Sequence, residues 1–141
     1  MADDFPRRIV DTIFRRAGGM CSNPGCSVLT SGPAEDVSKA VVVGEAAHIY
    51  GARPGSARFN PEMSAAERSD ITNAIWLCRN CHKLADTNAR RYSADLLFEW
   101  RHTHERAITK RLGKTSDILQ AEVLERRLTG FERVSLWRAR L

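Results

Sequence analysis

The 141-residue chain lacks the long apolar run that a membrane-spanning helix requires. It also lacks internal repeats and low-complexity tracts, and only 7% of its residues are aromatic. The N-terminal string Met1-Ala-Asp-Asp-Phe-Pro6 has no basic start, apolar core or small-residue cleavage site of the kind that directs secretion. These absences favour one small globular domain without a membrane span, and they predict a cytoplasmic protein.

Positive charges exceed negative charges only slightly, with a formal net charge of +5. Residues 1–81 carry nine Lys or Arg against nine Asp or Glu, whereas residues 82–141 carry thirteen against eight. The whole excess therefore follows the second cysteine pair. A basic face of this kind suits a phosphate backbone, although a solvated helical surface explains it equally well.

Cysteine is scarce, and the four cysteines form two pairs, Cys21-x4-Cys26 and Cys78-x2-Cys81. Two disulfides or four buried thiols are the alternatives, but disulfides are rare in the cytoplasm. Four thiolates from two short loops suit tetrahedral Zn2+ and close its coordination sphere. We therefore expect one structural zinc, which would supplement the modest core of a chain this short.

Hydrophobic periodicity and turn residues predict an α+β order of elements. The expected elements are a helix over 6–17, a turn-rich segment over 21–38, a strand over 40–49, a long connection over 50–72, a second strand over 75–77, and helices from His82 and from 93 to about 112. Ser64-Ala-Ala-Glu67 is a capping box inside the long connection. Pairing the two strands would bring His48, Asn73 and the second cysteine pair together.

The order of His48, Asn73 and His82, set between the two cysteine pairs, resembles that of the HNH endonucleases. The resemblance covers roughly residues 20–105. Within this family, the residues of the matching segments are most similar to the HNH domain of bacterial anti-phage effectors. In those effectors the HNH domain is joined to a nucleotide-sensing SAVED domain. The matching strings are Cys21-Ser-Asn-Pro-Gly-Cys26, Thr30-Ser-Gly-Pro33, Gly44-Glu-Ala-Ala-His-Ile49 and Asn73-Ala-Ile-Trp-Leu-Cys-Arg-Asn-Cys81.

The resemblance implies a zinc-stapled ββα-metal core with flanking helices and DNA as the substrate. It implies that His48 is the general base and that His82 and Asp86 hold a catalytic Mg2+ or Mn2+. Asn73 would either ligate that ion or hydrogen-bond the backbone that holds His48. The residues that we expect to contact the substrate are Arg53, Arg58 and Lys83.

One departure from the family pattern concerns the metal site. Many HNH enzymes carry Asp or His directly before the base, and here that position is Ala47. Glu45 could substitute, but strand alternation places it on the face opposite His48. The alanine favours an alternative function, a catalytically degenerate zinc module that binds nucleic acid or a partner protein.

The domain organisation follows from where the motif ends. We expect a nuclease domain over residues 1–112 and a helical extension over 113–141. The apolar residues of this extension either close the domain, form a homodimer contact, or lead into a further domain such as a nucleotide sensor.

Overall fold

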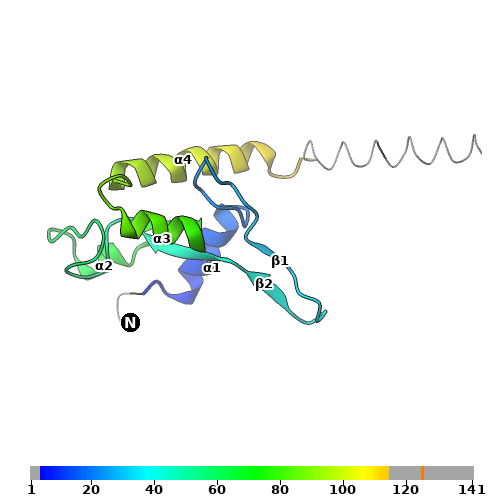
Figure 1. Ribbon diagram of the computed structural model, residues 1–141, viewed down its shortest axis with the longest axis horizontal. Helices are drawn as coiled ribbons and strands as arrows, with labels where there is room; N and C mark the ends of the chain where they lie inside the picture. The colour runs from blue at the N-terminus through cyan, green and yellow to red at the C-terminus, as the bar shows by residue number, and fades with distance from the viewer. Residues whose placement is uncertain (1–3, 115–124, 126–141) are drawn as a thin grey trace, which may run out of the picture. The chain divides into compact units, whose positions relative to one another are not determined.

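The computed structural model describes residues 4–114 and Glu125, and this part of the chain has a mixed α+β arrangement (Figure 1). The strands form two antiparallel sheets of two strands each. The predicted α+β class is therefore confirmed. In chain order the elements are α1 (Arg7–Arg16), β1 (Ser31–Pro33), β2 (Ala40–Val42), β3 (Gly44–His48), α2 (Ala65–Arg68), a 3-10 turn (Ile71–Asn73), β4 (Ala74–Cys78), α3 (Arg79–Thr87) and α4 (Ala94–Arg111).

The sheet of β3 and β4 has the predicted pairing, with a register that runs from Gly44 opposite Cys78 to His48 opposite Ala74. The single strand expected over 40–49 was wrong, because the chain changes partner at Val43. The Val43 N–H donates to the carbonyl of Thr30, and the Val43 carbonyl accepts from the N–H of Arg79. Residues 40–42 therefore pair with β1, a strand inside the segment that was expected to be turn-rich.

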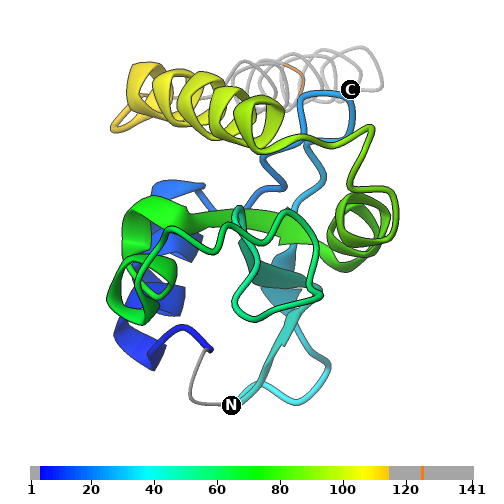
Figure 2. The ribbon, with the colours of Figure 1, turned by 90° about the vertical axis from the view of Figure 1, so that its left-hand side faces the viewer.

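The two faces of the β3–β4 sheet are covered by different helices (Figure 2). On one face, Ala74 and Trp76 pack with the apolar side of α1, including Ile9 and Ile13. On the other face, the strands pack against α3 and α4. That second core consists of Cys21, Ala47, Ile49, Ile75, Leu77, Cys78, Cys81, Ala85 and Leu97.

Local signals explain where the helices begin and end. Gly18 and Gly19 adopt positive φ angles of 61° and 69° directly after α1, which ends that helix. The capping box of Ser64 and Glu67 opens α2 as predicted. The helix expected from His82 begins earlier, at Arg79, because the sulfur of Cys78 accepts the N–H of Cys81 and caps it.

The longest of the described helices, α4, is tied to α1 and to the start of β4 by polar contacts. Arg16 of α1 makes a two-pronged ion pair with Glu105 of α4. Arg101, whose side chain is nearly buried, donates to the carbonyls of Ile71 and Ala74. The contacts of Arg101 hold the start of β4, the strand that ends at Cys78.

The described residues up to Ile108 belong to one compact unit, and a second unit begins at Thr109. The helical extension expected over 113–141 lies outside the described residues except for Gly113, Lys114 and Glu125. Among the described residues, no helix combines the length and apolar character needed to cross a membrane.

Candidate metal centre and active site

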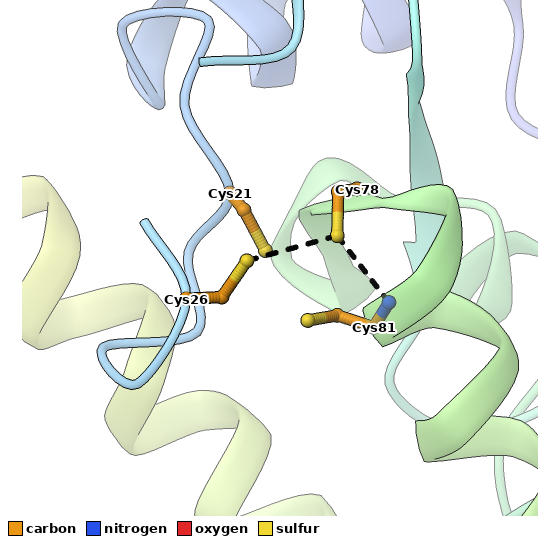
Figure 3. Close-up of side chains that lie close together, drawn as sticks. All are labelled: Cys21, Cys26, Cys78 and Cys81. Carbon is orange, nitrogen blue, oxygen red and sulfur yellow. Dashed lines mark hydrogen bonds between the residues drawn. The ribbon is translucent and has the colours of Figure 1, made fainter. Parts of the chain in front are cut away.

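The four cysteines converge on one point, as Figure 3 shows. Their sulfur atoms all lie within 4.8 Å of one another, and the sulfurs of Cys26 and Cys78 are 3.8 Å apart. Ligands about 2.3 Å from a tetrahedral zinc ion lie about 3.8 Å apart, whereas a disulfide needs about 2.05 Å. All four are free cysteines. The cluster could therefore hold a metal ion, and its geometry is compatible with the predicted structural zinc.

The loop that carries Cys21 and Cys26 is shaped by Asn23. Its backbone carbonyl accepts the N–H of Cys26, and its side-chain oxygen accepts the N–H of Gly25 at 2.9 Å. Its side-chain amide points across to the sulfur of Cys81 at 3.5 Å. One residue thus closes the first cysteine loop and contacts a sulfur of the second pair.

The acidity of the thiols depends on burial and on local donors. Burial raises the pKa of Cys81 to about 11, and it also raises the pKa of Cys21. Burial opposes ionisation of Cys78 as well, but hydrogen bonds from Cys81, Cys21 and Cys26 together outweigh it and lower the pKa of Cys78. A bound cation would displace the remaining thiol protons, so metal binding at this cluster is coupled to pH.

His48 ends β3, and its ring is positioned by an aromatic neighbour that the sequence did not reveal. The imidazole stacks on the ring of Phe5, with centroids 3.9 Å apart and planes 12° from parallel. Phe5 is buried just before α1, so the segment that leads into this helix supports the plane of the imidazole.

Asn73 is buried, and its side chain bonds only to backbone groups in the described contacts. Its oxygen accepts the N–H of Tyr50 at 2.8 Å, and its amide donates to the carbonyls of Tyr50 and Arg68 at 2.9 Å each. Of the two arrangements that the sequence left open, ligation of the ion or hydrogen bonding to the backbone, the side chain of Asn73 adopts the second. It fixes the turn that follows His48.

His82 and Asp86 lie on one side of α3 and are in contact, with 3.0 Å between Nε2 and Oδ2. The other ring nitrogen of His82 lies 3.6 Å from a carboxylate oxygen of Glu45. The hydrogen bond to Asp86 raises the pKa of His82, and Glu45 adds to this effect. Burial would raise the pKa of Asp86, but hydrogen bonds from His82 and Arg58 lower it.

Glu45 and Ala47 occupy the face of β3 opposite His48, as strand alternation predicts. Helix α3 covers that face, so Glu45 contacts His82 of α3. Glu45 and His48 nevertheless lie on opposite faces of β3. Alternation was right about the strand, but it gave no information on the helix that supplies the second histidine.

Arg58 is not at an exposed loop tip, because only 5% of its side chain is accessible. Its guanidinium donates to the carbonyls of Ile49, Ala85, Tyr92 and His48 and to Asp86 Oδ1, the last at 2.7 Å. The expected contact with substrate phosphate therefore conflicts with its placement. Arg58 instead connects the end of β3 to α3.

Two of the other cationic residues do lie at the surface of the site. Arg53 is exposed and lines a cavity of about 150 Å³ together with His48, His82 and Asp86. Lys83 is exposed beside a second cavity, of about 390 Å³, that Arg79 also lines. Sequence reasoning missed Arg79, although its place between the two cysteines of the second pair could have indicated it.

A third cavity beside the site has a volume of about 690 Å³ and is lined by residues of both sheet faces. His48, Glu45 and His82 all line it, with Phe5 and Trp76 among its apolar walls. The structure therefore brings the predicted base and the predicted helix histidine to one space. Comparison of the sequence with protein-family models and with curated proteins finds no match.

Proposed function

We propose that the chain is a divalent-metal-dependent endonuclease of the HNH type that hydrolyses DNA on a zinc-stapled ββα-metal core. The observation that carries the proposal is the shared cavity of His48, at the end of β3, and His82, on α3. The order β3, β4, α3 and the cysteine cluster beside it support the same fold.

Hydrolysis of a phosphodiester requires a deprotonated water, a neutralised phosphate and a stabilised leaving oxygen. His48 in its neutral form can accept the proton of the water at physiological pH. Phe5 fixes the plane of this imidazole, and Asn73 fixes the backbone that follows it. A divalent ion bound beside His82 would supply positive charge at the phosphate and at the leaving 3′ oxygen.

Exposed cations that line the cavities support a nucleic-acid substrate, and the family resemblance is the reason for proposing DNA. Arg53 lies beside His48, and Lys83 and Arg79 lie beside His82. Contacts of this kind position a phosphate backbone without reading its sequence. A role in bacterial anti-phage defence, controlled by a nucleotide-sensing domain or partner, is a wider proposal that rests on the family resemblance alone.

One observation favours the alternative function, a zinc module that binds nucleic acid or a partner protein without cutting. Ala47 is 1% exposed in the core, at the position where many HNH enzymes have a metal ligand. Asp86 is already paired with the buried Arg58, which competes with any bound ion.

The experiment that separates these functions is cleavage of supercoiled plasmid by the zinc-loaded chain. We expect nicked and linear products with Mg2+ or Mn2+ and none when the added divalent ion is omitted. Lack of cleavage with every divalent ion, combined with salt-dependent DNA binding, would favour the binding module.

A further inference from the structure

We propose that Glu45 and Nδ1 of His82 are the protein ligands of the catalytic divalent ion. Asp86 then positions His82 through its Nε2 atom, and Arg58 holds Asp86 in place. The inference deepens the proposed function, since it names the ligands of that function's ion. It also replaces the ligand pair expected from the sequence, His82 and Asp86.

The two nitrogens of His82 face different carboxylates. Nε2 lies 3.0 Å from Asp86, which is hydrogen-bonding distance, whereas Nδ1 lies 3.6 Å from Glu45, which is too long for a hydrogen bond. A metal-bound histidine normally donates its second N–H to a carboxylate, a backbone carbonyl or a water molecule. The short contact to Asp86 matches that donated bond, so Nδ1 is left to face the ion.

The separation of Nδ1 and the Glu45 carboxylate suits two ligands of one ion. Adjacent ligands about 2.1 Å from an octahedral ion lie about 3.0 Å apart, so a small side-chain movement is enough. The Glu45 side chain is 46% exposed at the edge of this face, which leaves space for such a movement.

Asp86 is less suited to be the ligand because it is committed to Arg58. Their oxygen and nitrogen are 2.7 Å apart, and the guanidinium is held in place by four backbone carbonyls. Moving Asp86 onto an ion would leave a buried cation without its counter-charge, which is costly.

The cavity of about 690 Å³ fits the same assignment, although Asp86 shares the cavity of about 150 Å³ with His48 and His82. Glu45 and His82 line the cavity of about 690 Å³ that also receives His48, and Asp86 is not among its lining residues. Asp4 and Asp11 line it too, but Glu45 is distinguished by its contact with His82. An ion held by Glu45 and His82 would therefore share its space with the base.

The test measures Mn2+ binding to the zinc-loaded full chain by calorimetry. We expect Glu45→Gln to weaken Mn2+ binding at least tenfold with no change in zinc content or melting temperature. Glu62→Gln, at an exposed glutamate outside the three cavities, is the matched control and should bind Mn2+ as the wild type does.

A second readout follows the proton on His82 by 15N NMR at alkaline pH without added divalent ion. We expect the wild type and Glu45→Gln to carry the proton on Nε2, facing Asp86. In Asp86→Asn the side-chain oxygen stays with Arg58 and its NH2 group faces Nε2, so the proton moves to Nδ1. Mn2+ binding should then weaken about 10- to 100-fold, as is typical for a lost outer-shell partner.

Wild-type affinity in Glu45→Gln, or a proton on Nδ1 in the wild type, would overturn this inference. If the wild type cuts DNA while Glu45→Gln binds Mn2+ normally, the inference fails and the nuclease proposal stands. If the wild type binds Mn2+ through Glu45 but cuts nothing, the nuclease proposal fails and the site stands. A wild type that takes up no Mn2+ contradicts both.

Discussion

Asn23 controls the shape of the first cysteine loop through both its backbone and its side chain. We expect Asn23→Ala to weaken zinc binding about 10- to 100-fold, because the contact to the Cys81 sulfur and the turn at Gly25 are both lost. Competition with a chelator for zinc measures the change.

The control is Asn80→Ala, which removes an exposed asparagine between the cysteines of the second pair. It should leave zinc affinity unchanged. Equal affinities in Asn23→Ala and the wild type would show that the four sulfurs alone determine the site.

At the residue scale, the sequence predicted which residues belong to the candidate sites better than it predicted the contacts between them. The spacing of the cysteines predicted a cluster that could hold a metal, and the structure brings the four sulfurs together. The contacts of Glu45 with His82 and of Arg58 with Asp86 were not predicted, because each depends on which side of α3 meets β3. Sequence spacing within one element carries no information about such contacts between elements.

At the element scale, the beginning of β3 depends on a glycine. A Cβ at Gly44 would lie 2.6 Å from the ring of Trp76, which is buried and tied to Thr30 by a hydrogen bond. The ring cannot easily move aside, so we expect Gly44→Ala to lower the free energy of unfolding by about 1–3 kcal/mol. Urea denaturation of the wild type and the variant measures this change in the free energy of unfolding.

Gly32, in β1, is the matched control because a Cβ there meets nothing within 4 Å. Gly32→Ala should change the free energy of unfolding by less than about 0.5 kcal/mol. Equal effects of the two substitutions would contradict the packing described for Trp76.

The elements themselves show which signals can be used without a structure. Capping and glycine signals predicted α2 and the end of α1, since both act within one turn of helix. The apolar run from 40 to 49 did not reveal its division at Val43. That division is produced by hydrogen bonds to Thr30 and Arg79, which lie far from it in the sequence.

At the scale of the whole molecule, Glu105 links α4 to α1. Burial opposes its ionisation, but hydrogen bonds and charge from Arg16 and Arg101 outweigh this and lower the pKa of Glu105. Because the pKa is lower in the folded state, the stabilisation is present above about pH 4.3, the unfolded value, and is lost as the pH falls through the folded value.

Glu105→Gln should therefore lower stability at pH 7 by on the order of 1 kcal/mol, after allowance for solvent screening. The difference from the wild type should shrink as the pH falls below about 4. Melting temperatures measured across this range test it, with Glu99→Gln, an exposed glutamate of the same helix, as the control. A difference that does not depend on pH would show that the ion pair is not its cause.

The proposed active site is itself a property of the whole fold. His48 comes from β3, His82 from α3 and the stacking ring of Phe5 from the segment before α1, and they line one cavity. The motif predicted the two histidines, but only the packing of α1 and α3 on opposite sheet faces brings Phe5 to His48.

The central claim is that His48 takes a proton from water during DNA cleavage. Single-turnover cleavage of a labelled duplex with Mn2+ tests it in the wild type and in His48→Ala. We predict a rate at least 100-fold lower in the variant, with DNA and zinc binding unchanged. The melting temperature should fall only slightly, since one ring stack of about 1 kcal/mol is lost. Equal cleavage rates in the two proteins would contradict the account.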